Sequence, residues 1–412
     1  MTERAIRIAG CRSCGSGELE GFLNLGQMPL SDGLRDEADL GHADARFPLE
    51  VAFCGSCGLV QILHTVPPEV LFADDYPYFS SFTDAIVSHA KLNVDARLTE
   101  RRLDAHDLVI EIASNDGYLL QHYRARGVRV LGVDPARGPV LAARARGVPT
   151  RHAFFTHSLA LDLAEAGDRA SVIHANNVLA HVSDTNGFVA GIAALLRPDG
   201  VAVIEVPYVR DLIDHNEFDT IYHEHLCYFS VTALVPLFER HGLSLNRVER
   251  VPIHGGSLRL FVEPREAVER SVEALLEQER ELGMDRLQYY AGFSRRVEAL
   301  RTELKDLLAA LLREGKRIAG YGAAAKGAIL LNHAGVGTET LAWVADKNVH
   351  KQGRYMPGVH VPIVPPARIL EDTPDYLLIL PWNFRDEIMQ QQREFAARGG
   401  RFIVPVPKPE VV

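Results

Sequence analysis

Residues 107–121 read Asp107-Leu-Val-Ile-Glu-Ile-Ala-Ser-Asn-Asp-Gly-Tyr-Leu-Leu-Gln121, an apolar β-rich run that breaks into a small polar turn and then into a helical pattern. The next run, Val128-Arg-Val-Leu-Gly-Val-Asp134, is a second short strand that ends in an acid. This order is typical of a nucleotide-binding α/β unit, in which the turn lies under the ligand and the acid binds a ribose. The pattern predicts a doubly wound α/β domain in the middle of the chain.

The turn after the first strand is acidic. A dinucleotide pyrophosphate requires Gly-x-Gly-x-x-Gly at the helix start, whereas this turn is Glu111-Ile-Ala-Ser-Asn-Asp-Gly117, with one glycine. Acidic side chains repel phosphate but suit a cationic ligand with an amino-acid tail, so the turn predicts S-adenosylmethionine. A generic doubly wound domain without a cofactor is the alternative. The residues expected to bind the cofactor are Glu111, Ala113, Ser114, Asn115, Asp116, Gly117, Asp134, Asn176 and Asn177.

The segment 170–206 continues the same plan. It predicts a strand at 170–174, a turn at 175–177, a helix at 188–196 and a strand at 201–206. The run Leu196-Arg-Pro-Asp-Gly200 comes before the last strand, and Leu-x-Pro-x-Gly at that point is common in class I methyltransferases. We therefore expect residues 76–250 to form a Rossmann-like class I methyltransferase domain.

The composition is that of a globular chain: 412 residues, 47% hydrophobic and 24% charged, which predicts about two to three domains. The 44 Lys and Arg against 54 Asp and Glu give a net charge of -10, so no nucleic-acid partner is expected. The first residues lack a signal-peptide core, and no run reaches the roughly 20 apolar residues of a membrane helix. We expect a cytoplasmic protein with no membrane partner.

The spacing of the cysteines predicts a metal site. Four of the five form Cys11-x2-Cys14 and Cys54-x2-Cys57, and each pair is followed by a glycine. Two such turns complete a closed tetrahedral shell, which is typical of structural zinc. Two unrelated reduced cysteine pairs are the alternative. We expect a zinc-binding domain at 1–75, in which strand-like 47–53 and the stretch 29–33 loop out between the pairs.

Several motifs occur in a fixed order along the chain. They are the two cysteine pairs, Tyr76-Pro-Tyr78-Phe79-Ser80-Ser81, the 111–117 turn, Tyr222-His223-Glu224-His225 and His254-Gly255-Gly256-Ser257-Leu258-Arg259. Together they resemble the zinc-containing, S-adenosylmethionine-dependent sugar C-methyltransferases of deoxysugar biosynthesis. The match spans nearly the entire chain and is closest to C-3' methyltransferases that act on dTDP-linked 4-keto deoxysugars. The resemblance implies a monomeric enzyme of natural-product (antibiotic) biosynthesis.

Methylation of a sugar carbon requires a carbon nucleophile, and a 4-keto group provides one by acidifying the C-3 proton. The enzyme must supply a base, a group that holds the enolate oxygen and an aligned methyl donor. Histidine suits the base because its unperturbed pKa of about 6.5 is close to working pH. The resemblance favours His225 as the base, with Tyr222 and Glu224 near the sugar.

Other interpretations of the segment Tyr222-His223-Glu224-His225 stay open. In an extended segment Tyr222 and Glu224 would face away from His223 and His225, whereas a turn would break that separation. His223 and His225 as a second metal site, or a purely structural turn, are alternatives, and His181 is the rival base. Tyr76, Tyr78 and Ser80 either reach the active site or anchor the domains.

The carboxyl-terminal third begins with charged, amphipathic segments at 268–282 and 293–313, expected to be a solvated helical connector. Lys316-Arg-Ile-Ala-Gly-Tyr-Gly-Ala-Ala-Ala-Lys-Gly327 then predicts a strand, a Gly-rich turn and a helix, and 341–346 a strand ending in an acid. This turn suits phosphate, so residues 251–412 are expected to be a second Rossmann-like α/β domain that binds the sugar nucleotide. The expected substrate residues are Tyr78, Ser80, His254, Gly255, Gly256, Ser257, Tyr321, Lys326 and Lys347, with Trp382 and Asn383 as further contacts.

Two other functions compete with methyl transfer. Gly320-x-Gly322 with Asp346 permits a nicotinamide-dependent oxidoreductase that acts on a nucleotide sugar. A zinc adaptor without catalysis is the other possibility, but it leaves the two nucleotide-type folds unexplained.

Overall fold

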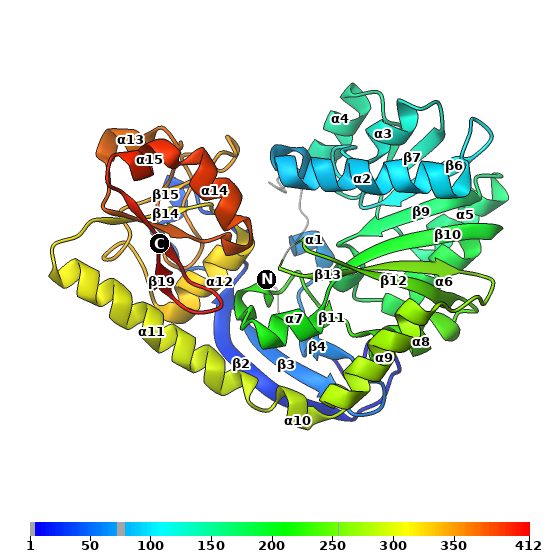
Figure 1. The fold of residues 1–412 in the computed structure, drawn as a ribbon, viewed down its shortest axis with the longest axis horizontal. Coiled ribbons are helices and arrows are strands. Elements are labelled where there is room, and N and C mark those ends of the chain that lie inside the picture. Colours follow the sequence, from blue (N-terminus) through cyan, green and yellow to red (C-terminus); the bar gives the residue numbers. More distant parts are fainter. Residues whose placement is uncertain (1–4, 72–78, 254) are drawn as a thin grey trace.

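The computed structural model describes residues 5–71, 79–253 and 255–412. Figure 1 shows the middle domain as the right lobe and the carboxyl-terminal domain as the left lobe, with the amino-terminal strands β2 and β3 below and between them. In the described part of the chain, no helix is both long enough and apolar enough to cross a membrane.

The middle domain is built on a sheet with the strand order β12-β13-β10-β9-β6-β7-β8. The strands from β10 to β8 are parallel to their neighbours, whereas β13 runs antiparallel to both β10 and β12. The predicted strand, turn and helix order of 107–134 is confirmed. The strands are β6 Leu108–Ile112, β7 Arg129–Asp134, β8 Thr150–His152, β9 Ala170–Asn176, β10 Leu196–Pro207, β12 Ser244–Val251 and β13 Ser257–Glu263.

The apolar residues of β6, β9 and β10 are buried because helices cover both faces of the sheet. The long α2 lies across the top of the sheet in Figure 1. The helices are α2 Asp84–Arg101, α3 Leu120–Arg124, α4 Arg137–Ala145, α5 His157–Glu165, α6 Thr185–Leu195, α7 Val209–Asp214 and α8 Val231–Glu239, with 3-10 turns η2 Ser80–Phe82, η3 Leu179–His181 and η4 Phe218–Thr220.

The amino-terminal domain has a sheet of order β11-β4-β3-β2, and its strand β11 comes from the middle of the chain. The strand-like run at 47–53 lies within β3, as predicted. The elements are β1 Ile6–Arg7, β2 Leu19–Pro29, η1 Glu37–Asp39, β3 Arg46–Cys54, β4 Val60–Ile62, β5 His64–Thr65, α1 Pro68–Leu71 and β11 Cys227–Tyr228.

The connector consists of α9 Arg270–Leu282, α10 Leu287–Tyr290 and α11 Phe293–Arg313. The expectation of a solvated connector is wrong for one face of each long helix. The buried stripe of α11 is Phe293, Val297, Leu300, Leu304, Leu308 and Leu311, and α9 buries Val272, Leu275 and Glu279. This spacing of three and four residues places the apolar side chains of α11 against β2 and α12, and those of α9 against β12 and α8 of the middle domain.

The carboxyl-terminal domain is a second α/β unit with the strand order β16-β15-β14-β17-β18-β19. Its strands are parallel except for β19, which runs antiparallel to β18. The elements are β14 Ile318–Tyr321, α12 Ala325–Ala334, β15 Val344–Ala345, β16 Ile363–Val364, α13 Arg368–Asp372, β17 Tyr376–Ile379, η5 Trp382–Phe384, α14 Arg385–Gln391, α15 Arg393–Ala397, β18 Arg401–Val404 and β19 Glu410–Val411.

Candidate active site

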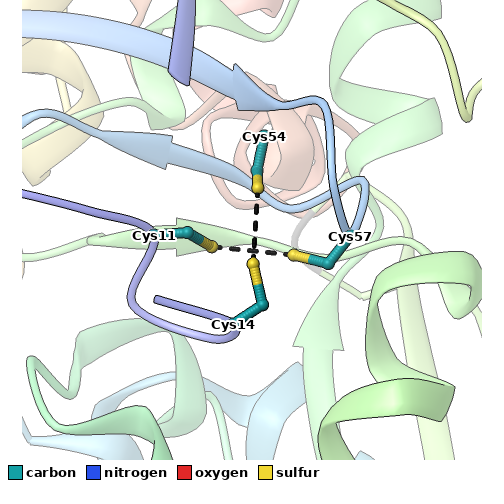
Figure 2. A group of neighbouring side chains, drawn as sticks. All are labelled: Cys11, Cys14, Cys54 and Cys57. Carbon is teal, nitrogen blue, oxygen red and sulfur yellow. Dashed lines mark hydrogen bonds between the residues drawn. The ribbon is translucent and has the colours of Figure 1, made fainter. Parts of the chain in front are cut away.

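The thiols of the two Cys-x2-Cys turns point toward one another (Figure 2). The Sγ atoms of Cys11 and Cys57 are 3.6 Å apart, as are those of Cys14 and Cys54. All four sulfurs lie within 4.8 Å of one another, too far apart for disulfides. This spacing fits four thiolates that each lie about 2.3 Å from one zinc ion. The shell is closed, so the zinc is structural.

The zinc site is joined to the middle domain through β4. Gln61 Nε2 donates to Cys11 Sγ at 3.2 Å, and Gln61 is paired across the sheet with Cys227 of β11. Because β11 follows residues 222–225 closely in the chain, the zinc-binding turns support that segment through one strand pairing.

The turn after β6 has an unusual backbone. Ala113, Asn115 and Gly117 have φ values of 55°, 48° and 77°. At Gly117 a Cβ atom would lie 3.0 Å from the Val148 side chain, which explains the glycine. Asp134 holds the turn, because its carboxylate accepts the N–H of Asn115 and the N–H of Ala136, both at 2.8 Å.

Buried polar atoms at this edge of the sheet have no hydrogen-bond partner among the described residues. They are Glu111 Oε2, Ser114 Oγ, Asp116 Oδ1, Asn176 Oδ1 and Asn177 Oδ1. A buried acceptor without a partner costs about 1 to 3 kcal/mol. The set therefore fits a ligand that donates hydrogen bonds.

The charges at this edge also favour a cation. Burial raises the pKa of Glu111 well above its ordinary value, and the neighbouring Asp134 and Asp116 raise it further. Burial likewise raises the pKa of Asp134 to about 6. A positively charged ligand would relieve this repulsion, and the ammonium and sulfonium groups of S-adenosylmethionine have the required charge.

The segment 222–225 is a turn, in which the N–H of His225 donates to the carbonyl of Tyr222 at 2.9 Å. The prediction for an extended segment, in which Tyr222 and His225 face opposite ways, is therefore wrong. The turn stacks the rings of Tyr222 and His225 with their centroids 4.0 Å apart. His225 Nδ1 lies 2.8 Å from the carbonyl oxygen of Thr220. A carbonyl only accepts, so Nδ1 carries the proton, and in the neutral imidazole Nε2 then accepts from the Tyr222 hydroxyl at 3.0 Å.

The rival histidine lies beside this pair. The rings of His181 and His225 are 4.6 Å apart and almost perpendicular. Burial lowers the pKa of His181 to about 4, so it is neutral at pH 7 and a weak base. The structure thus brings both histidines together and gives them different environments.

Glu224 and His223 point elsewhere. Glu224 is buried and accepts from Ser31 Oγ at 2.9 Å, and burial followed by the charge of Asp32 raises its pKa. His223 is buried and packs with its ring 5.8 Å from that of Phe47. The second metal site gains no support, since in the described ranges the cysteines form the sole group of three or more ligands that could hold an ion.

The remaining residues near this site divide into two groups. Tyr76, Tyr78 and His254 lie outside the described residues. Ser80 donates its N–H to Asn115 Oδ1 at 2.9 Å, and Ser257 donates its hydroxyl to the Ile253 carbonyl at 3.0 Å. The glycines Gly255 and Gly256, with φ of 98° and 134°, pack against the carboxylates of Glu217 and Asp211.

The Gly-rich turn of the carboxyl-terminal domain is held in the same way as the first turn. Asp346 accepts the N–H of Ala323 at 2.7 Å, and Gly322 has a φ of 84°. Lys326 donates to Asn383 Oδ1 at 2.8 Å and lies 4.4 Å above the Trp382 ring.

The other two substrate residues predicted here have different surroundings. Tyr321 directly precedes Gly322 and directs its hydroxyl toward Gln391 of α14, at 3.4 Å. Lys347 is exposed. Of these three residues, Lys326 contacts the two further predicted residues, Trp382 and Asn383.

Sequence reasoning missed several residues that contact the 222–225 turn or the neighbouring η4 from distant parts of the chain or through the backbone. Thr220 contributes a backbone carbonyl, for which no sequence signal exists. Ser31 belongs to the stretch 29–33, expected only to loop out, yet it contacts Glu224. Asp219 is fully buried and accepts from Trp382 Nε1 at 2.8 Å.

The sheet order, with the antiparallel β13 beside β10, and the acidic turn after β6 define a class I methyltransferase. Residues 89–248 match the family of methyltransferase domains, residues 11–72 a zinc binding domain and residues 252–407 the C-methyltransferase C-terminal domain. The chain is 38% identical to C-methyltransferase NovU of Streptomyces niveus over 98% of this chain and 97% of that protein. It belongs to the zinc-containing, S-adenosylmethionine-dependent C-methyltransferases.

Other similarities are local. A ubiquinone biosynthesis O-methyltransferase of Azorhizobium caulinodans is 27% identical over 97 residues, which cover 23% of this chain and 38% of that enzyme. The S-adenosylmethionine-bound magnesium protoporphyrin IX methyltransferase of Synechocystis has a TM-score of 0.33 at 16% identity, and the match covers 44% of this chain and 82% of that one.

Proposed function

We propose that this enzyme methylates C-3' of a dTDP-linked 4-keto deoxysugar, with His225 as the base. One observation carries the proposal: the Nδ1–H of His225 is anchored on the Thr220 carbonyl, which leaves Nε2 as a proton acceptor. A neutral imidazole with a fixed tautomer is what abstraction of a weakly acidic C–H proton requires.

In the proposed reaction, Nε2 takes the C-3 proton, and the electron pair of that C–H bond becomes the enolate. S-adenosylmethionine supplies an electrophilic methyl group. The enolate carbon would form the new C–C bond as the methyl–sulfur bond breaks, so that S-adenosylhomocysteine leaves with that electron pair and the 4-keto group is restored. The imidazolium then gives its proton to water.

Tyr222 has a second role in this scheme. Its hydroxyl donates to the same Nε2 that must receive the substrate proton, so it has to leave when the sugar binds. A phenol released there can donate to the developing enolate oxygen, which is the electrostatic stabilisation that enolate formation needs.

The cofactor is assigned to the turn after β6, with the methionine part facing Glu111 and Asp116 and the ribose near Asp134. The sugar nucleotide is assigned to the carboxyl-terminal domain, with its diphosphate at the Gly-rich turn before α12. The N–H groups of a helix start favour an anion. We propose the same division of the chain by ligand: zinc at 1–75, cofactor at 76–250 and sugar nucleotide at 251–412, with β13 Ser257–Glu263 of the last segment completing the sheet of the middle domain.

The test is turnover with a panel of 4-keto nucleotide sugars and methyl-labelled S-adenosylmethionine, with NMR to locate the label. We expect the label on C-3' of a dTDP-linked sugar. Label on oxygen, or on no tested sugar, would overturn the proposal. Tight NAD binding without S-adenosylmethionine binding would favour the oxidoreductase instead.

A further inference from the structure

The turn η4 lies between the catalytic histidine and the carboxyl-terminal domain. On one side, the carbonyl of Thr220 accepts the Nδ1–H of His225 at 2.8 Å. On the other side, the preceding residue, Asp219, accepts the indole N–H of Trp382 at 2.8 Å. The path from Trp382 to His225 therefore consists of two hydrogen bonds and one peptide link.

The η4 turn is clamped against that domain by neighbouring contacts. Phe218 is fully buried and its ring lies 5.2 Å from that of His333 on α12. The hydroxyl of Thr220 donates to the carbonyl of Glu217 at 2.6 Å, which closes the turn on itself. A turn held at both ends in this way has little freedom to reorient its carbonyl.

The burial of Asp219 makes its hydrogen bond with the Trp382 indole N–H important. Asp219 is fully buried, and its Oδ1 has no hydrogen-bond partner within the described segments. Burial raises the pKa of Asp219 to about 6, while Lys326 and the Trp382 N–H act in the opposite direction. Removal of the indole N–H would leave a buried carboxylate that lacks its donor, so η4 would have to move to find water.

We propose that Trp382 and Asp219 are positioning residues for the base: the carboxyl-terminal domain holds η4 through this hydrogen bond, and η4 fixes the tautomer and the direction of His225. The inference rests on the proposed function for the role of His225. It makes the competence of the base depend on the domain assigned to the sugar nucleotide, although Trp382 and Asp219 themselves need not touch the reacting atoms.

The first test is Trp382→Phe, which keeps an aromatic ring over Lys326 and removes the N–H. We expect kcat and the rate of C-3 proton exchange to fall about 10-fold, because the base is less well oriented. The KM for S-adenosylmethionine should stay unchanged, since the cofactor turn lies on other strands.

The chain offers a matched control. Its other tryptophan, Trp343, donates its indole N–H to Asp372 Oδ2 at 3.0 Å, within the carboxyl-terminal domain. Trp343→Phe removes the same kind of bond at a place that does not contact η4, so its activity should stay within about twofold of wild type. Equal losses in the two variants would overturn the proposal, as would an unchanged kcat in Trp382→Phe.

Substitutions of Asp219, the acceptor of the Trp382 hydrogen bond, distinguish a loss of positioning from a loss of folding. Asp219→Asn keeps a carbonyl oxygen for the indole N–H and should retain most activity, whereas Asp219→Ala should lose about as much as Trp382→Phe. If Asp219→Ala does not fold, as shown by the loss of its thermal transition, the activities of Asp219→Asn and Trp382→Phe are compared with that of wild type. Activity of Asp219→Asn near wild type supports the proposal, and a loss as large as that in Trp382→Phe overturns it.

A readout without turnover distinguishes this inference from the proposed function. In ¹⁵N-histidine NMR, with the His225 signals identified by their loss in His225→Gln, wild type should show the Nδ1–H tautomer and Trp382→Phe a mixture. An unchanged tautomer would overturn the positioning role even if sugar methylation is established. A changed tautomer in an enzyme that methylates no sugar would refute only the proposed function.

Discussion

At the scale of single residues, the hydrogen-bond partners and the burial of each polar side chain determine its protonation and its capacity to act as a base. Two histidines lie in ring contact, yet His225 has a backbone acceptor on Nδ1, whereas burial lowers the pKa of His181 to about 4. The residue types in the cluster were predictable, because base chemistry at neutral pH favours histidine. The Thr220 carbonyl was not, since any residue at 220 supplies the same backbone group.

The two histidines can be separated by substitution. His225→Asn should lower kcat about 10² to 10⁴-fold, the usual contribution of a general base, and leave the affinity for S-adenosylmethionine nearly intact. His181→Asn should cost less. The measurement is exchange of the C-3 proton with solvent deuterium in the absence of methyl donor. Wild-type exchange in the His225 variant together with lost exchange in the His181 variant would reverse the assignment.

Substitution of Glu111 tests the cofactor site, because it should raise thermal stability and lower the affinity for S-adenosylmethionine. Glu111→Gln removes a buried carboxyl group whose ionisation is opposed by burial, so the protein without ligand should melt at a higher temperature. The affinity for S-adenosylmethionine should fall about 10 to 100-fold, because a hydrogen bond to a charged group is worth about 1.5 to 3 kcal/mol. Calorimetric titration and thermal melting measure the two quantities. Unchanged affinity would place the methionine part elsewhere.

At the scale of elements, local patterns predicted the strands and the turns but not the pairings between distant segments. The apolar run and acidic turn of 107–117 contain their own signal, and so do the two Cys-x2-Cys turns. The pairing of β11 with β4 joins residues far apart in the sequence, and β11 is too short to show a period. The charged helices at 268–313 suggested solvation because their apolar stripe is narrow, although tertiary packing buries it.

The β4–β11 pairing makes the zinc site relevant to activity as well as to folding. Cys57→Ser should release zinc, lower the thermal stability and, with His225 as the proposed base, lower methyl transfer, because the strand next to the 222–225 turn loses its anchor. Cys227→Ser is the control: this buried thiol lies on β11 but outside the zinc-binding group, so zinc should remain bound. Metal analysis and activity are measured together. Stable, fully active Cys57→Ser protein without zinc would contradict the argument.

At the scale of the whole molecule, buried acids gather around the sites assigned to the two ligands. Burial is the largest cause that raises the pKa of each of them. They are Glu111, Asp134, Glu217, Asp219 and Glu224, with values of about 6 for Asp134 and for Asp219. The folded chain therefore holds protons that the unfolded chain releases near pH 4, where free carboxyl groups titrate.

This arrangement predicts a pH dependence with a definite sign. For these acids the folded state binds more protons than the unfolded state above about pH 4, so the linkage relation makes their contribution to stability fall as pH rises. The buried histidines His174, His181 and His223 have lowered pKa values and oppose this trend below about pH 7, where unfolded histidines still bind protons. Stability from these groups is full below about pH 4 and is lost as the pH passes through their raised pKa values. Zinc sets the lower limit of the test, since thiolates are protonated and release the metal in acid.

The midpoint of thermal unfolding should accordingly drop between about pH 7 and pH 8, where histidines are mostly neutral in both the folded and the unfolded state. S-adenosylmethionine should reduce that drop, because its positive charge stabilises the ionised form of the acids around it. Glu217→Gln should flatten the slope, whereas Asp386→Asn, an exposed acid on α14, should leave it unchanged. A midpoint that rises over this range with zinc bound throughout would mean that these acids are already ionised in the folded enzyme, and it would contradict their raised pKa values.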